Sequence, residues 1–208
     1  MTVISVGLVF KLIGKTKMTA YTIDFNPIIQ LTDDQFYQLC RANPDLKFER
    51  NAQGELIIMP PTGGETGNQN FEFGADLAIW NRQTRLGVGF DSSTCFKLPN
   101  GGNRSPDLAW VIQERWEALS PEQRTKFPPI CPDFVVELMS PLDRLKDTQD
   151  KMKEYIENGA RLGWLIAPEM RRVEIYRPQQ AVEVLEAPVT LSGESVLPGF
   201  ILNLSSIW

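Results

Sequence analysis

Residues 132–141 read PDFVVELMSP, and this stretch decides which fold the rest of the chain can adopt. Its residues alternate as in a β-strand, so that Phe134, Val136 and Leu138 face one way while Val135 and Glu137 face the other. Each large apolar side chain that such a strand buries contributes about 1.5–3 kcal/mol, whereas a carboxylate among them costs several unless it is paired or bound to a cation. The stretch therefore predicts a buried core strand in which Glu137 has a cationic partner.

Two segments on either side of this strand carry residues that could meet Glu137. Residues 104–111, RSPDLAWV, again place Pro-Asp before an apolar strand, and residues 146–158 predict a helix that contains Lys151 and Lys153. If the two strands are successive in one sheet, Asp107 and Glu137 can converge, and the helix can bring a lysine to them. Carboxylates hold Mg²⁺ and an ammonium group steadies developing charge, so these residue types suit metal-assisted phosphodiester cleavage.

The helical pattern favours one lysine over the other. Lys151 and Lys153 lie on opposite shoulders of the apolar stripe, and Tyr155 follows Lys151 by one turn, which makes Lys151 the better candidate for a partly buried lysine. Purely structural roles stay open on spacing alone. Asp147 could form a salt bridge with this lysine, and an arginine could pair with Glu137.

Composition narrows the classes of protein. The chain has 208 residues, of which 42% are hydrophobic, and this is enough for one substantial core. It has no histidine, which excludes a Ser-His-Asp triad and any histidine-ligated metal. Its three scattered cysteines indicate free thiols in a reducing compartment, and we expect a cytoplasmic protein. The net charge of −5 argues against a broadly basic nucleic-acid binder but not against a local basic groove.

The N-terminal segment is expected to lie outside the main domain. Residues 3–13 are apolar, but lysines follow this run instead of preceding it, which is the wrong order for an export signal. Met18 is an alternative initiator. No run is long enough to cross a membrane. We expect an extension at residues 1–25 and one domain at residues 26–208.

The remaining elements follow from local patterns. Thr32 is a helix N-cap, with the helix running to about Ala42. A second helix is expected from about Glu65 to Arg82, with Phe71 contributing to its apolar surface. The other expected elements are a hairpin (47–50 and 55–59), strands that form a meander (87–91, 94–98 and the Asp107 strand), two short helices within 113–127, a second hairpin (162–167 and 172–176) and short strands in the last 30 residues.

An ordered series of motifs resembles the Uma-type family of putative restriction endonucleases, which belongs to the PD-(D/E)xK nuclease superfamily. The motifs are PPTGGE (60–65), SPD (105–107), PDFVVELMSP (132–141), DTQDKMKEY (147–155), GARLGWLIAP (159–168) and VEIY (173–176). The match extends from the first helix to the end of the chain. The resemblance implies an α/β, restriction-endonuclease-like fold with a mixed central sheet flanked by helices.

The same resemblance implies roles for individual residues. It makes Asp107 and Glu137 the metal-binding carboxylates and Glu65 an auxiliary acid near the metal or its water. The usual superfamily lysine would stand two residues after Glu137, where this chain has Met139. In this family the lysine is on the following helix, and the position one helical turn before Tyr155 indicates Lys151.

We therefore expect a Mg²⁺- or Mn²⁺-dependent endonuclease that hydrolyses phosphodiester bonds of DNA. The resemblance also implies a homodimer, since nucleases of this superfamily often pair two sites to address two strands. One alternative is a catalytically inactive nuclease-fold protein with a structural or interaction role. Another is a ribonuclease-H-like metal hydrolase, which requires a different strand order.

Overall fold

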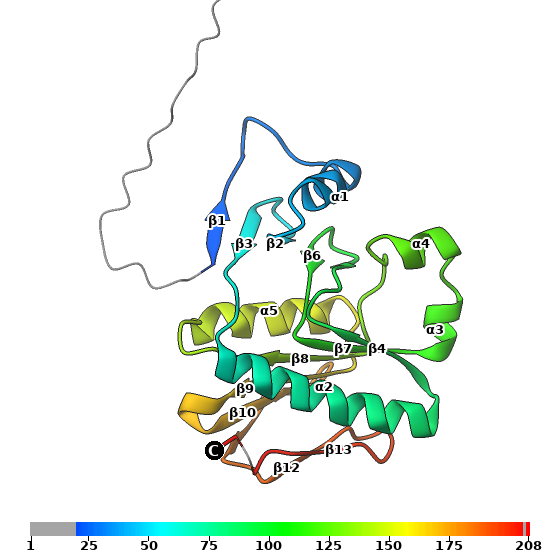
Figure 1. The fold of residues 1–208 in the computed structure, drawn as a ribbon, viewed down its shortest axis with the longest axis vertical. Helices are drawn as coiled ribbons and strands as arrows, with labels where there is room; N and C mark the ends of the chain where they lie inside the picture. The colour runs from blue at the N-terminus through cyan, green and yellow to red at the C-terminus, as the bar shows by residue number, and fades with distance from the viewer. Residues whose placement is uncertain (1–19, 206) are drawn as a thin grey trace, which may run out of the picture.

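The computed structural model describes residues 20–205, 207 and 208, and Figure 1 shows their arrangement. The first 19 residues of the expected N-terminal extension, including Met18, lie outside the described residues. The helices are α1 (Asp33–Ala42), α2 (Gly64–Thr84), α3 (Gln113–Glu117), α4 (Pro121–Thr125) and α5 (Leu145–Glu157), with a short 3₁₀ turn at Pro168–Met170. The strands are β1 (Tyr21–Ile23), β2 (Lys47–Arg50), β3 (Leu56–Met59), β4 (Gly87–Asp91), β5 (Phe96–Lys97), β6 (Asn103–Arg104), β7 (Leu108–Ile112), β8 (Phe134–Leu138), β9 (Leu162–Ala167), β10 (Arg172–Tyr176), β11 (Glu183–Glu186), β12 (Thr190–Ser192) and β13 (Ile201–Asn203).

A mixed central sheet organises the described residues. Its six strands run in the order β11-β10-β9-β8-β7-β4, with β8 parallel to β9 and the other neighbours antiparallel. The segment 132–141 contributes β8, which lies between β7 and β9 inside this sheet. The expected mixed α/β sheet is confirmed, with β8 as a buried central strand.

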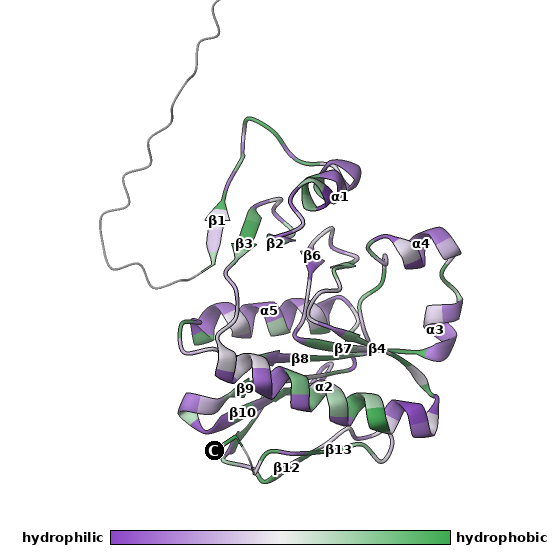
Figure 2. Ribbon diagram, viewed as in Figure 1, coloured by the Kyte–Doolittle hydropathy of each residue, from purple (hydrophilic) through white to green (hydrophobic). Residues whose placement is uncertain are grey.

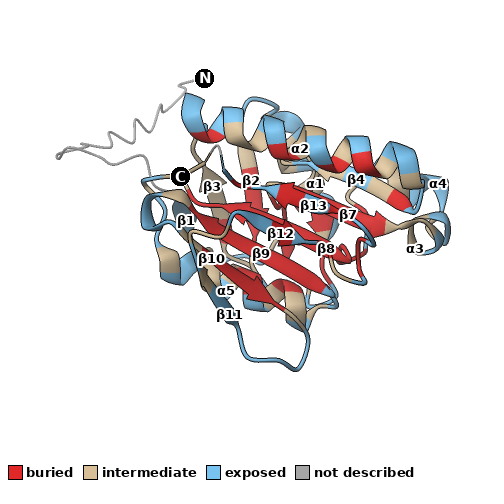
Figure 3. Cartoon of the chain, turned by 90° about the horizontal axis from the view of Figure 1, so that it is seen from below, coloured by how far each residue is buried: buried red, intermediate tan, exposed pale blue. Residues whose placement is uncertain are grey.

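Layers cover both faces of this sheet, as Figure 3 shows from below. Phe134, Val136 and Leu138 belong to the core cluster that includes residues of α2, β12 and β13, while Val135 joins the cluster that includes residues of α5. The alternation predicted for this strand is therefore confirmed. In Figure 2, α2 and α5 carry both hydrophilic and hydrophobic colours, and each contributes buried residues to the core cluster on its own face of the sheet.

A second sheet lies on one side of the central layers. Its strands run in the order β1-β3-β2-β6-β5, and with α1 it encloses a cluster of its own around Phe36, Phe48 and Leu56. The expectation of a single meander is wrong, because β4 pairs with β7 in the central sheet whereas β5 pairs with β6 in the small one. Residues 92–95, between β4 and β5, include a turn at Ser92 and Ser93 and connect the two sheets.

Local capping and packing explain the helix boundaries. The Thr32 hydroxyl accepts a hydrogen bond from the Gln35 backbone amide, and the Gln35 side-chain oxygen accepts one from the Thr32 backbone amide, so the predicted start of α1 is confirmed. On α2, however, Phe71 is 72% exposed, and the buried stripe consists of Phe73, Leu77 and Trp80. The prediction for Phe71 is wrong because its side chain lies on the solvent-exposed side of the helix.

Among the described residues, every helix is too short or too polar to span a lipid bilayer.

Candidate active site

The two predicted carboxylates lie opposite each other at the end of β7 and β8. In the antiparallel register Leu108 faces Val136, and continuing it by one residue places Asp107 opposite Glu137. Paired residues of neighbouring strands point to the same face, so both side chains leave the same side of the sheet. The backbone amide of Leu138 donates a hydrogen bond to Asp107 Oδ2 over 2.9 Å. This bond fixes one oxygen of the Asp107 carboxylate beside the strand that carries Glu137.

Helix α5 brings Lys151 to these carboxylates. Lys151 Nζ lies 2.8 Å from Glu137 Oε1, and the Tyr155 hydroxyl donates to the same oxygen over 3.0 Å. The lysine side chain is 13% exposed, whereas that of Lys153 is 53% exposed and lies near Asp150 on the outer side of the helix. The helical argument that selected the lysine one turn before Tyr155 thus describes the observed geometry.

Glu49 is a third carboxylate of this site, and sequence reasoning missed it. Its Oε1 lies 2.9 Å from Lys151 Nζ and accepts a hydrogen bond from the Ser105 amide over 3.0 Å. Its Oε2 lies 3.0 Å from Arg104, which also binds Glu154 on α5 at 2.6 Å. Glu49 belongs to β2 of the small sheet, so this network connects the small sheet to α5 and β8. The signal was present in Lys47–Arg50, where an acidic residue interrupts a predicted hairpin strand.

The predicted auxiliary acid lies elsewhere. Glu65 is exposed on the first turn of α2 and is not among the described residues that line the cleft at this site, although Gly63 and Thr66 are. The structure therefore brings together Asp107, Glu137 and Lys151 but not Glu65. It is Glu49 that contacts the lysine as an additional carboxylate.

The two glutamates that share Lys151 titrate in opposite directions. Burial raises the pKa of Glu137 to about 7, and the neighbouring Asp107 and Glu49 charges add to this rise against the attraction of Lys151. Burial acts on Glu49 too, but Lys151 and Arg104 outweigh it and lower the pKa to about 2. Burial also raises the pKa of Asp107. Glu49 is therefore the permanent anion of the site, while Glu137 can exchange a proton near neutral pH.

The cationic partner is held in its charged form. Burial alone would lower the pKa of Lys151, but Glu137 and Glu49 raise it above the ordinary value. Burial and Glu137 likewise raise the pKa of the Tyr155 hydroxyl, so this group remains a hydrogen-bond donor. The site thus presents a fixed ammonium group between two carboxylates, and this group is no proton acceptor at neutral pH.

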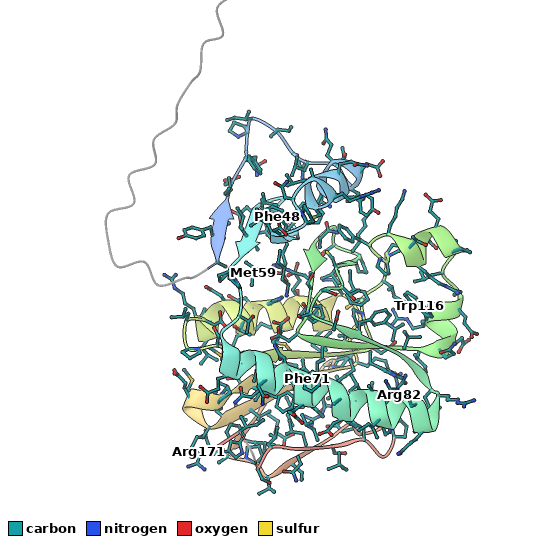
Figure 4. All side chains as sticks on the ribbon, viewed as in Figure 1. Phe48, Met59, Phe71, Arg82, Trp116 and Arg171 are labelled. Carbon is teal, nitrogen blue, oxygen red and sulfur yellow. The ribbon has the colours of Figure 1, made fainter. Side chains whose placement is uncertain are left out.

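A cleft of about 940 Å³ gives access to these groups. It is lined by Asp107, Glu137, Lys151 and Glu49 together with parts of the small sheet, the loop before α2 and residues along α5 from Asp147 to Glu157. Figure 4 labels Met59, one of the lining residues, between the small sheet and the layer that holds α2 and α5. Among the described lining residues, carboxylates outnumber basic side chains. A polyanion would meet a net negative surface there unless cations neutralise it.

The donor set fits a magnesium ion that also binds its substrate. Among the described residues, no three or more acidic, cysteine or histidine side chains are grouped so that they could hold a metal by themselves. Mg²⁺ usually uses one or two carboxylates, several waters and substrate phosphates instead of an all-protein cage. Asp107 and Glu137, opposite each other and open to the cleft, match that smaller set.

The fold and this arrangement define a restriction-endonuclease-like α/β protein. The chain is similar to a crystal structure described as "a putative nuclease belonging to DUF820" from Anabaena variabilis ATCC 29413, with a TM-score of 0.71. The two share 23% sequence identity, and the alignment covers 85% of this chain and 97% of that one. At this identity the similarity concerns the fold.

The family follows from the sequence match. The model of the Uma2 family, described as "putative restriction endonuclease", matches residues 33–205 of this chain. The chain therefore belongs to the Uma2 family, as its motifs indicated. No curated protein gives a match.

Proposed function

We propose that this chain is a divalent-metal-dependent endonuclease that hydrolyses phosphodiester bonds of DNA. The observation that carries the proposal is the meeting of Asp107 and Glu137 at the open end of two paired strands, with Lys151 Nζ 2.8 Å from Glu137. Membership in a family of putative restriction endonucleases supports the same reaction class.

Asp107 and Glu137 would hold Mg²⁺, or Mn²⁺, at the floor of the cleft. When bound, the ion would act as a Lewis acid that stabilises negative charge on the phosphate and the leaving oxygen. Glu137 must lose its proton to serve as a ligand, because its pKa of about 7 leaves part of it protonated at neutral pH. The reaction should therefore be faster at pH 8 than at pH 6.

Lys151 acts as a cation in this proposal and not as a general base. Its raised pKa keeps the ammonium group charged, so it can orient the attacking water by hydrogen bonding and offset negative charge on the phosphate. Glu49 is a positioning residue, because it holds Lys151 at 2.9 Å and is itself held by Arg104. Without Glu49 we expect Lys151 to turn fully toward Glu137 and to compete with the metal for that carboxylate.

The wider setting of the reaction is also proposed. We infer DNA as the substrate, a cytoplasmic location and a homodimer in which each site cuts one strand. A dimer predicts that nicked and linear plasmid forms appear together and that cleavage per protomer rises with protein concentration. A monomer by sedimentation that still linearises plasmid would contradict the paired-site arrangement while leaving hydrolysis intact.

The test is cleavage of supercoiled plasmid with Mg²⁺, Mn²⁺ or EDTA, comparing the native chain with Asp107→Asn. The matched control is Asp76→Asn, which removes an exposed carboxylate from α2. We expect nicking that needs the metal, persists in Asp76→Asn and disappears in Asp107→Asn. Equal activity in the native chain and Asp107→Asn would refute the site. DNA binding without cleavage in any metal would favour the inactive nuclease-fold alternative.

A further inference from the structure

One face of the small sheet is directed toward the candidate site. Along β2, Lys47 and Glu49 lie on one face and Phe48 lies on the other, because successive side chains of a strand alternate. Phe48 belongs with Phe36 of α1 to the core cluster of the small sheet, whereas Glu49 contacts Lys151 of α5. Lys47 therefore leaves β2 in the same direction as Glu49, toward the site.

The lining of the cleft agrees with this direction. Lys47 is half-buried and lines the cleft together with Met59, its partner in the antiparallel register, which Figure 4 labels. Ile57, the register partner of Glu49, lines the cleft too. Phe48, which lies between the two charged residues of β2, is not among the described lining residues. One wall of the cleft is thus the face of the small sheet that carries Lys47.

The charge of Lys47 also acts on one of the two proposed metal ligands. Burial raises the pKa of Asp107, and the Leu138 amide together with the positive charges of Lys151 and Lys47 opposes this rise. Two lysines therefore act on one carboxylate from different elements, β2 of the small sheet and α5. An ammonium group of the small sheet is close to the carboxylate that is expected to hold the metal.

The basic residues of the cleft differ in their partners. Those among the described lining residues are Lys47, Arg104, Arg144 and Lys151. Carboxylates hold Arg104 and Lys151, which share Glu49. In the part of the chain that the structure describes, Lys47 and Arg144 form no salt bridge, and Arg144 is exposed at the start of α5 whereas Lys47 is half-buried. Because charges that leave water usually have a partner, Lys47 is the one available to an anionic ligand beside the site.

We propose that Lys47 is a substrate-binding residue whose ammonium group binds a phosphate oxygen of the nucleic-acid strand held at Asp107 and Glu137. The inference rests on the proposed function, because it needs such a strand in the cleft. The strand then lies between two lysines, Lys47 of the small sheet and Lys151 of α5. Lysine and arginine contacts to phosphate supply most of the affinity for a nucleic acid, and here they must also offset the carboxylates of the lining.

The test compares two substitutions of this lysine. Lys47→Met removes the charge with little change in length, and Lys47→Arg keeps the charge. Lys153→Met is the matched control, because it removes one positive charge from the exposed outer side of α5. The Kd for a fluorescent duplex oligonucleotide is measured with Ca²⁺ in place of Mg²⁺. At low salt we expect it to be about tenfold higher in Lys47→Met than in Lys153→Met, and close to the native value in Lys47→Arg.

The salt dependence of binding identifies the contact as one to phosphate. Without one lysine–phosphate contact about one counterion fewer is released, so the slope of log K against log salt should become shallower by about 0.9 in Lys47→Met. The loss of affinity should be the same for oligonucleotides of unrelated sequence. In cleavage assays with Mg²⁺ the KM should rise about tenfold while kcat stays within about threefold, because ground-state and transition-state binding are lost together.

The outcomes separate this inference from the proposed function. Metal-dependent cleavage by the native chain, with equal Kd and equal salt slope in Lys47→Met and Lys153→Met, would overturn the role of Lys47 and leave the nuclease in place. A fall in kcat with an unchanged Kd would overturn it as well, since Lys47 would then act on the reaction and not on binding. A native chain that neither binds nor cuts DNA would overturn both. Thermal unfolding checks that the variants are folded, and Lys47→Gln replaces Lys47→Met if the latter is not.

Discussion

Two buried glutamates on one face of the central sheet have nearly the same local setting. Glu137 on β8 and Glu174 on β10 are both paired with Leu165 of β9 in the register of the sheet, so they point to the same face. Each accepts a hydrogen bond from a tyrosine hydroxyl, Tyr155 at 3.0 Å for Glu137 and Tyr176 at 2.6 Å for Glu174. Each also meets a basic side chain.

Their surroundings differ beyond that first contact. Glu174 is bound by Arg172 at 2.7 Å and by the Gln149 amide at 2.9 Å, is 1% exposed, and is not among the described residues that line the cleft. Glu137 faces Asp107 and does line the cleft. Glu174 is thus a buried glutamate paired with an arginine. The sequence allowed the same purely structural role for Glu137.

The comparison shows that a buried carboxylate with a basic partner does not by itself define a site. What distinguishes Glu137 is the Asp107 carboxylate opposite it, which adds to the rise that burial causes in the pKa of Glu137, and its place in the lining of the cleft. Matched substitutions at the two glutamates can therefore separate chemistry from packing.

The largest expected difference is in cleavage. Glu137→Gln should reduce metal-dependent plasmid cleavage about a thousandfold, because a lost metal ligand forfeits several kcal/mol of transition-state stabilisation. Glu174→Gln should cleave within about twofold of the native rate. Initial rates in Mg²⁺ for the two folded variants provide the measurement, and a similar loss in both would mean that the contrast is one of stability only.

The next difference is in stability. Lys151→Met leaves Glu49 and Glu137 without their shared cation, and breaking a buried pair in this way costs about 3–5 kcal/mol of unfolding free energy. Arg172→Met should cost less, roughly 1–3 kcal/mol, because Gln149 and Tyr176 still donate to Glu174.

Urea unfolding of the two variants compares these losses. If Lys151→Met does not fold, the double variant Lys151→Met/Glu137→Gln is measured in its place. It also neutralises one of the two carboxylates, so it should be more stable than Lys151→Met. A Lys151→Met variant as stable as the native chain would show that the observed ion pairs contribute nothing.

The pH dependence of stability isolates the raised pKa of Glu137. Its folded pKa of about 7 exceeds the ordinary value of 4.5, so the folded state binds this proton more tightly than the unfolded state. This contribution to stability is complete below pH 4.5 and is lost as pH rises to about 7.

Comparing the unfolding free energies of the native chain and of a variant with a neutral side chain at this position provides the measurement. The unfolding free energy of the native chain minus that of Glu137→Gln should fall across this window by an amount on the order of 3 kcal/mol. A flat difference between pH 4.5 and 8 would show that Asp107 and burial do not hold the proton on Glu137. The same subtraction with Glu174→Gln provides the reference for a closed glutamate.

The smallest expected effect comes from the two tyrosines. Tyr155→Phe removes one hydrogen bond to Glu137 and should lower the cleavage rate about tenfold, since hydrogen bonds to charged groups are worth about 1.5–3 kcal/mol. Tyr176→Phe removes the corresponding bond to Glu174 and should leave the rate within about twofold. Rates that fall equally in both variants would indicate that the two glutamates are coupled through α5.

Much of the fold could be predicted because its signals are local. The alternation in residues 134–138, the Thr32 cap and the turn between β2 and β3 depend on neighbours within a few residues, and the structure confirms each. Phe71 was misjudged because residues 64–84 lack a strong apolar period, so that several faces could have been the buried one.

The candidate site was only partly predictable. Asp107 and Glu137 could be paired because their strands follow each other, and Tyr155 marked Lys151 because both lie on one helix. Glu49 could not be connected to them, because it comes from a strand of the other sheet whose approach to α5 depends on how the two sheets pack. The split between β4 and β5 was missed for the same reason.

By itself, the sequence determined the elements, the strand that carries Glu137, the family and the helix face that presents Lys151, since periodicity and capping act within one element. Only the tertiary structure decided which carboxylates share the lysine, that Glu49 contacts it while Glu65 is exposed, and that Glu137 opens to a cleft whereas Glu174 is closed. The reason is that burial, charge coupling and access depend on segments far apart in the chain. Their free energies exist only after the two sheets and α5 have packed together.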